Sequence, residues 1–357
     1  MATDNTFYID TSLFSTATAV WTDTALTAKA VDGWYQAPVE GVIAYRQQTS
    51  GLLGAVTNCV CTVSCDIPVS ADGAIGSYVV DIDTGDDVAD IGALVIYFTA
   101  QNIPDGILAT YDSATYNTLT SNAHGVEIAT AGELNFVGQS TVSGCEASDL
   151  EGSTTSVNNF AYNGSGFSTD GTSTSIVIPA SGTVNLNATG NLWYTLVIPK
   201  PNATPSTLNL QMVGVCDGTV FAFKAFCPAA LPSFTTNSVE ATAVLACAAT
   251  QDQTYYFAHN SSTSGGTSPV IDGNIIPQVG NFVYSDNTGT TALANGFYKL
   301  SSTTVAQVAS GVVSAISICL TPWSSSAGTN FGSVCSLTID QTYYHDGAGV
   351  FPAVADH

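Results

Sequence analysis

The pentapeptide Asp252-Gln-Thr-Tyr-Tyr256 occurs again as Asp340-Gln-Thr-Tyr-Tyr344, and a near copy, Asp4-Asn-Thr-Phe-Tyr8, stands close to residue 1. Each copy ends in a pair of aromatic residues, which favour β-strands over helices. A phrase that recurs in this way indicates an internal repeat. We therefore expect a β unit to begin at each of the three copies.

A second set of matching segments extends two of these copies. Val20-Trp-Thr-Asp23 aligns without gaps with Val283-Tyr-Ser-Asp286. The match continues to Asp32-Gly-Trp-Tyr35 and Asn295-Gly-Phe-Tyr298. Asp-Gly and Asn-Gly dipeptides favour turns that need positive φ. Each repeat is thus predicted to be a small β unit.

The composition is that of an all-β protein. Thr, Ser, Val, Tyr, Phe and Gly are abundant, whereas Lys and Arg, which coat exposed helices, number only 5 of 357 residues. Between the repeats, short apolar runs at 78–82, 93–98 and 192–198 are bounded by Gly, Pro, Asn and Asp. The expected fold class is all-β, with several antiparallel β-sandwich or jelly-roll-like modules in tandem and negligible helix.

Cysteines near the ends of the repeats indicate where the modules meet. We expect a β repeat A at 1–65, a central β-sandwich domain at 66–235, a β repeat B at 236–335 and a partial repeat C at 336–357. Repeat C contains the pentapeptide but not the aromatic strand and turn that follow it in A and B.

Either the sequence is a fragment, or something else completes repeat C. The second alternative predicts that repeat C adds or exchanges a strand with a neighbouring subunit at an open sheet edge. Its expected anchors are Tyr343, Tyr344, Phe351 and Val354.

The charge balance excludes two classes of partner. The chain has 28 acidic and 5 basic residues, a formal charge of −23. Nucleic acids and anionic membrane surfaces are bound by cationic faces, so neither is an expected partner. No run of 18 apolar residues occurs, and we expect no membrane insertion.

Two clusters have the chemistry of metal ligands. Alternating carboxylates on a loop with a glycine supply oxygen ligands to Ca²⁺. The candidate calcium ligands are Asp81, Asp83, Asp86 and Asp87, with Asp90 further along. Gly92 stands where a helix-loop-helix calcium site has a bidentate Glu, so a solvated acidic loop is the favoured alternative. The segment Cys59-x-Cys61-x₃-Cys65 is a weaker candidate for zinc, because it lacks the usual two-residue gap.

The nine cysteines favour disulfide bonds over a zinc cluster. The candidates are Cys216 and Cys227, which flank the strand expected at 220–226, and Cys319 and Cys335, which bracket the end of repeat B. Buried reduced thiols are the alternative if assembly takes place in a cytoplasm. Because nine is odd, at least one cysteine has no partner within the chain.

No motif for catalysis stands out. The pattern Gly-x-Ser-x-Gly is absent, and no pair of carboxylates is singled out for glycoside hydrolysis. We expect no enzyme and no catalytic residue, and no cofactor other than the candidate Ca²⁺.

The aromatic residues of the repeats have two interpretations. They form the core that so small a unit needs, which is the favoured interpretation, or they stack on sugar rings. They are Phe7, Tyr8, Trp21, Trp34 and Tyr35 in repeat A, and Tyr255, Tyr256, Tyr284, Phe297 and Tyr298 in repeat B.

The repeat segments at 7–10, 20–35 and 283–299 resemble modules in structural proteins of tailed bacteriophages, marine phages and cyanophages among them. The central segments Ile103-Pro-Asp-Gly106 and 193–200 are similar to a β-sandwich found alongside those modules. The resemblance implies a virion component of a tail, neck or fibre appendage, with host attachment as a role. The implied partners are other copies of the chain, other virion proteins and a host-surface glycan. A bacterial extracellular adhesin or carbohydrate-binding β-sandwich protein is the alternative.

Overall fold

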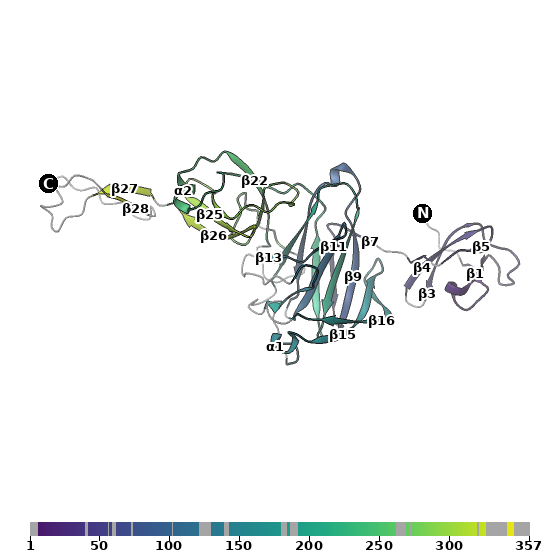
Figure 1. Cartoon of the computed structure of the whole chain (residues 1–357). Coiled ribbons are helices and arrows are strands. Elements are labelled where there is room, and N and C mark those ends of the chain that lie inside the picture. The colour runs from purple at the N-terminus through teal and green to yellow at the C-terminus, as the bar shows by residue number, and fades with distance from the viewer. Residues whose placement is uncertain are drawn as a thin grey trace.

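In the computed structural model the chain is built almost entirely of β-strands (Figure 1). The structure describes residues 6–39, 42–55, 57–58, 62–72, 74–101, 103–120, 130–138, 143–179, 184–185, 192–261, 269–271, 273–319, 321–325 and 341–345. Within these ranges the only α-helices are α1 (Ala147–Leu150) and α2 (Ala243–Ala248). The strands form several separate, mainly antiparallel sheets, so the expected all-β class is confirmed.

The central domain is a sandwich of two sheets. The first sheet has the order β13 (Leu119–Thr120), β18 (Tyr194–Lys200), β10 (Gly92–Thr99), β20 (Val220–Ala225) and β8 (Pro68–Asp72). The second has at its centre β9 (Gly76–Asp83), β19 (Thr207–Gly214), β11 (Asp105–Tyr111) and β14 (Asn135–Val137). Without the short edge strand β13, and lettered B to I in chain order, the two sets of four strands have the orders G-D-I-B and C-H-E-F. This is the topology of a jelly roll.

Further strands widen the second sheet. β15 (Thr154–Tyr162) and β16 (Phe167–Val177) form a hairpin, and β15 pairs in parallel with β9. The remaining members are β7 (Thr62–Ser64) beside β9, β12 (Ala114–Tyr116) beside β11 and β17 (Val184–Asn185) beside β14.

The core of the jelly roll lies between its two sheets. Successive side chains of a strand point to opposite faces, so every second residue is available for burial. In β19, Leu208, Leu210 and Met212 point inward and are fully buried. β10 contributes Leu94, Ile96 and Phe98 from the facing sheet. Alternate side chains of these strands therefore fill the space between the two sheets.

The Asp105 carboxyl is one of several buried polar groups of this domain that lack a full set of hydrogen-bond partners. Asp105 at the start of β11 has no exposed surface, and burial raises the pKa of its carboxyl well above the ordinary value. The Thr219 hydroxyl donates to Oδ1, which opposes part of this rise. Among the described residues Oδ2 has no hydrogen-bond partner. Burial thus favours the protonated form of this carboxyl group over the charged form.

We expect Asp105→Asn to raise the melting temperature at pH 7. A carboxyl whose pKa is raised by folding costs stability as the pH rises above its unfolded pKa of about 3.9. The gain should therefore vanish below about pH 4. Scanning calorimetry at both pH values measures it, with Asp217→Asn, an exposed turn residue, as the control. A variant that is less stable than the parent at pH 7 contradicts the assignment.

Among the described residues there are three disulfide bonds, and the candidates Cys216, Cys227 and Cys319 each take part in one, but not with the partners that their positions suggested. The bonds join Cys65 to Cys227, Cys145 to Cys216 and Cys247 to Cys319. A bond between Cys216 and Cys227 is wrong because extended β20 lies between them. Its 6 residues hold the two ends about 20 Å apart, whereas a disulfide needs Cα atoms within about 7 Å. Cys319 is not bonded to Cys335, which lies outside the described residues.

Two further modules flank the jelly roll (Figure 1). Module A contains β1 (Tyr8–Ile9), η1 (Phe14–Thr16), β2 (Val20–Trp21), β3 (Gly33–Val39), β4 (Val42–Thr49), β5 (Leu52–Leu53) and β6 (Thr57–Asn58). Module B contains β21 (Ser233–Thr236), α2, β22 (Gln253–Ala258), β23 (Phe282–Tyr284), β24 (Gly296–Lys299), β25 (Thr304–Ala309) and β26 (Val312–Ile318). The expected boundaries near 65 and 236 differ from the structure by one strand each. β7 precedes residue 65 but pairs with β9 of the jelly roll. β21 begins before residue 236 but pairs with β22 of module B.

Modules A and B share one backbone arrangement. The pair Tyr8 and Trp21 between β1 and β2 corresponds to Tyr256 and Tyr284 between β22 and β23. Further equivalent pairs are Gln48 and Leu53 with Val308 and Val313, and Ala44 and Asn58 with Thr304 and Ile318. The turns match as well, since Ser50 and Ser310 both have positive φ, 53° and 51°. The repeated sequence therefore folds twice into the same unit.

A carboxylate closes the same loop in each module. Asp23 accepts hydrogen bonds from the amides of Thr27 and Ala28 at 3.1 and 2.7 Å. Asp286 accepts equivalent bonds from Thr290 and Thr291 at 2.9 and 2.7 Å. These bonds explain why an Asp ends the aromatic strand in both repeats.

We expect Asp286→Asn to weaken module B at pH 7. Burial raises the pKa of Asp286, but hydrogen bonds from Thr288, Thr290 and Thr291 outweigh it and lower the pKa to about 2. A lowered pKa stabilises the folded state above the unfolded value of about 3.9. That contribution is lost as the pH falls towards about 2. Melting curves between pH 2 and 7 should show this loss in the parent and not in the variant; equal curves contradict it.

Candidate functional site

The acidic loop after β9 uses its carboxylates for hydrogen bonds within the protein. Asp81 Oδ1 accepts from Asn209 Nδ2 at 2.7 Å, and Asp83 Oδ1 accepts from the Gly85 amide at 3.0 Å. Asp87 begins η2 (Val88–Asp90) in a capping box with Asp90. Within the described ranges, no group of three or more His, Cys, Asp or Glu is arranged to hold a metal ion. The calcium site at Asp81, Asp83, Asp86 and Asp87 stays a prediction.

A buried lysine lies close to this loop. The Lys200 side chain has no exposed surface, and its Nζ donates to the carbonyls of Asn202 and Ala203 at 3.1 and 2.6 Å. Burial lowers the pKa of Lys200, while the charges of Asp90 and Asp86 raise it. The pKa of Lys200 is lowered overall, so the two carboxylates offset only part of the effect of burial.

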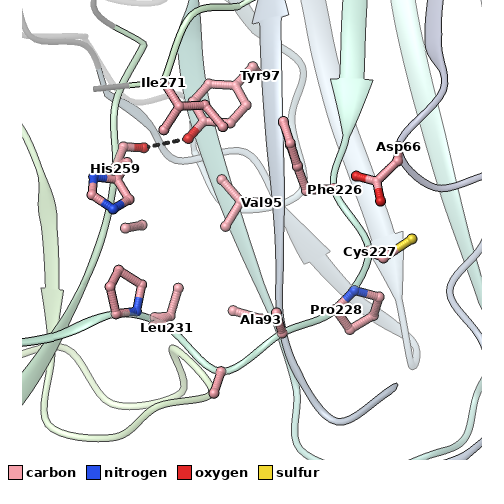
Figure 2. A pocket seen from close by; sticks show the side chains of 14 residues that line it. Asp66, Ala93, Val95, Tyr97, Phe226, Cys227, Pro228, Leu231, His259 and Ile271 are labelled. Atoms are coloured by element: carbon pink, nitrogen blue, oxygen red, sulfur yellow. Dashed lines mark hydrogen bonds between the residues drawn. The ribbon is translucent and has the colours of Figure 1, made fainter. Parts of the chain in front are cut away.

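A hollow of about 390 Å³ lies between the jelly roll and module B (Figure 2). Val95 and Tyr97 of β10 face Leu231 and His259 across it, and the Tyr97 hydroxyl donates to the His259 carbonyl at 2.9 Å. The titratable side chains among its lining residues are Asp66, Tyr97 and His259, whereas Cys227 is held in a disulfide. The walls are mostly apolar, as expected of a joint between two packed modules.

The interface between the jelly roll and module B also contains a cluster of buried side chains. Its members are Ala93, Val197, Leu231, Ala258, Phe282 and Tyr284. The Thr120 hydroxyl also donates to the Gly280 carbonyl at 3.0 Å. Module B is thus packed directly on the first sheet of the jelly roll.

Module A leaves exposed a face whose equivalent in module B is covered by another segment of module B. Trp34 on β3 is 61% exposed, whereas its counterpart Phe297 on β24 is partly buried. The backbone of Phe297 exchanges two hydrogen bonds with Glu240, from the segment between β21 and β22. Trp34, Gln47 and Leu52 line an open hollow of about 400 Å³ on module A.

The exposed fractions of the repeat aromatics distinguish those that form a core from those that could stack on a sugar ring. In module B, Tyr284 and Tyr298 are 8% and 1% exposed, as expected of core residues. In module A, Phe7 is 41% exposed, and its ring meets Tyr35 edge-on at 5.2 Å. Trp34 is therefore the repeat aromatic best placed to meet a ligand or a partner.

Strands β27 (Thr321–Ser325) and β28 (Gln341–His345) form a hairpin, of which only β28 lies within the expected partial repeat C at 336–357. The two strands pair with each other, and β28 carries Tyr343 and Tyr344. The predicted anchors Phe351 and Val354 lie outside the described residues.

Hairpin β27–β28 has the register of the first two strands of module B. Trp323 opposite Tyr343 corresponds to Phe234 opposite Tyr255. The next pairs, Ser324 with Thr342 and Ser325 with Gln341, correspond to Thr235 with Thr254 and Thr236 with Gln253. The third copy therefore begins with β27, before the pentapeptide.

A sequence signal for this first strand is present. Leu231-Pro-Ser-Phe-Thr-Thr236 and Leu320-Thr-Pro-Trp-Ser-Ser325 have the same order of aromatic and hydroxyl residues, and each precedes a pentapeptide. By contrast, the residues of the joint around Leu231 and His259 share no motif, so sequence alone does not bring them together.

Comparisons of the chain with protein-family models, with curated proteins and with solved structures give no match. Among the described residues, no helix has the length and apolar character needed to cross a membrane.

Proposed function

We propose that the chain is a non-enzymatic structural protein of a tailed-bacteriophage particle, a tail, neck or fibre component that assembles through its β modules. The observation that carries this proposal is hairpin β27–β28. Its strand β28 matches β22 of module B, which is paired on both edges, but within the described ranges β28 is paired on one edge only. Unpaired N–H and C=O groups on such an edge accept another strand.

Two other features support a place in a virion. Double-sheet jelly rolls recur in viral coat proteins, although the same fold also occurs in lectins and enzymes. Three disulfide bonds persist only where the surroundings do not reduce them, which suits a particle outside the cell. Antibodies raised against the chain should label an appendage of the phage particles that encode it, as seen by electron microscopy.

Removing residues 336–357 should abolish self-association, because β28 is lost with them. The jelly roll and module B should keep their melting transitions, since neither pairs with β28. Sedimentation velocity and calorimetry measure the two effects. A shorter deletion of 346–357 is the matched control, because it keeps β28 and tests the anchors Phe351 and Val354. Oligomers of unchanged size after the longer deletion contradict the proposal.

Host attachment, or the alternative function of an extracellular carbohydrate-binding protein, is favoured by one observation. Trp34 is exposed next to the amide of Gln47 at an open hollow, which suits stacking on a sugar ring. Full-length protein should then bind members of a glycan array, and Trp34→Ala should abolish binding while Phe7→Ala leaves it intact. Loss of binding in both variants, or in neither, rules out Trp34 as the sugar platform.

A further inference from the structure

The hollow between the jelly roll and module B has the size of a ligand pocket. Its volume of about 390 Å³ lies within the range of roughly 300–1,000 Å³ that is usual for small-molecule sites. Such sites often lie where two domains meet, as this one does. The two modules do not need the hollow to be filled, because the buried cluster with Phe282 and Tyr284 already packs them together. The hollow therefore has room for a second molecule.

The jelly-roll wall of the hollow is held in place by backbone hydrogen bonds. Ala93 and Ala229 exchange two of them, at 2.8 and 3.2 Å, and the Phe226 amide donates to the Val95 carbonyl at 2.9 Å. The next residue, Cys227, is fixed by its disulfide bond. A ligand thus meets a wall that is already formed, and its binding has to order few protein groups.

The interior of the hollow is apolar and partly aromatic. Val95, Leu231 and Ile271 line it, and Figure 2 shows their side chains around the same space. The rings of Tyr97 and Phe226 meet edge-on, with their centres 5.5 Å apart. Transfer of hydrocarbon from water to such walls is favourable. The ligand is therefore expected to have an apolar body.

One carboxylate distinguishes an end of the hollow. Asp66 is the only acidic residue among those that line it, and Figure 2 shows Asp66 on the opposite side from His259. The Asp66 amide donates to the Ala225 carbonyl at 2.6 Å, which fixes the backbone there. Within the described ranges, the exposed Asp66 carboxylate makes no hydrogen bond and no ion pair. It is therefore available to a cation.

The charges near the hollow favour a cationic ligand. The formal charge of −23 raises the concentration of cations at the surface of the protein. Lys224 Nζ lies 4.3 Å from the centre of the Phe226 ring, but Lys224 is not among the lining residues. Its charge limits what a bound ammonium group gains from that ring. Asp66 is thus the group that selects for positive charge.

We infer that the hollow between the jelly roll and module B binds a small amine with an apolar body. The body lies against Val95, Tyr97 and Leu231, and the ammonium group lies beside Asp66. Because Asp66 is exposed, both charges keep contact with water, and neither has to be buried. This inference goes beyond the proposed assembly function and does not depend on it.

Isothermal titration calorimetry of the full-length chain tests the inference with probes of one shape. Phenethylamine, phenethyl alcohol and phenylacetate share a ring and a short arm, and they carry a positive charge, no charge and a negative charge. The amine should bind about two- to fivefold more tightly than the alcohol, which is the contribution of an exposed ion pair. The acid should bind most weakly. Added salt should reduce the advantage of the amine and leave the alcohol unaffected.

Two variants locate the bound probe. Asp66→Asn should remove the difference between the amine and the alcohol, whereas Asp217→Asn, which is also exposed, is the matched control and should keep it. Ala230 is an exposed lining residue, so Ala230→Trp should fill the hollow and abolish binding of both probes. Ala25→Trp, at an exposed turn of module A, is the control for this change. Melting curves show whether each variant is folded.

The inference is overturned if the amine does not bind, or if the amine and the alcohol bind equally well. A preference for the amine that survives Asp66→Asn also overturns it, as does binding that survives Ala230→Trp. If Ala230→Trp does not fold, Asp66→Asn decides alone, because it changes one exposed side chain without altering its size.

Discussion

Replacing Cys65 and Cys227 together by serine is expected to lower the free energy of unfolding of the jelly roll by about 5 kcal/mol. The bond spans 162 residues, and the entropy that a cross-link removes from the unfolded chain grows with the logarithm of this span. Cys65 directly follows β7, and Cys227 lies two residues beyond β20. The bond therefore ties the first strands of the domain to its last strand.

The measurement is denaturant unfolding followed by the fluorescence of Trp193, which is 2% exposed in the jelly roll. The matched control is the double replacement of Cys247 and Cys319, whose bond spans 72 residues around module B. That control should weaken module B and leave the Trp193 transition in place. A midpoint unchanged by the loss of Cys65 and Cys227 would show that the unfolded domain is already compact without the bond.

The repeats were predictable because their signals are local. The Asp that ends each aromatic strand binds amides four and five residues later, so its effect is confined to one loop. The turns at Ser50 and Ser310 are formed by two adjacent residues. Such features can be recognised in a short stretch of sequence, and they occur again wherever that stretch is repeated.

The disulfide partners were not predictable because they follow from the topology of the jelly roll. Cys65 meets Cys227 since β8 pairs with β20, which places Pro68 opposite Lys224 although 156 residues separate them in sequence. No local pattern distinguishes this pairing from others among the strands of the domain. Cys216 is the nearest cysteine to Cys227 in sequence, but extended strand β20 lies between them and keeps them apart.

The surroundings of Trp34 were also beyond sequence reasoning. Its alignment with Phe297 predicts the same backbone, and the structure gives both residues that backbone. Their exposure differs because Glu240 belongs to a segment that precedes the aligned part of module B. A candidate site can therefore differ between two copies of one fold through what is added outside the repeat.

Phe221→Ala is expected to be the second most damaging change, with a loss of about 3–5 kcal/mol in the free energy of unfolding. Phe221 has no exposed surface, and its ring lies 5.0 Å from that of Tyr78 and 6.1 Å from that of Phe167. Truncation leaves a cavity between the two sheets that these neighbours cannot fill without leaving their own positions.

Trp34→Ala is the matched control for Phe221→Ala, because it removes an even larger aromatic ring from a position that is 61% exposed. In the monomer with its disulfide bonds intact, this change should stay within about 0.5 kcal/mol. Denaturant unfolding at low protein concentration compares the two variants. A large loss for Trp34→Ala would place that ring in a core, and would remove the exposed tryptophan from the sugar-binding argument. A small loss would agree with a Trp34 ring that lies on the surface of module A, as the sugar-binding proposal requires.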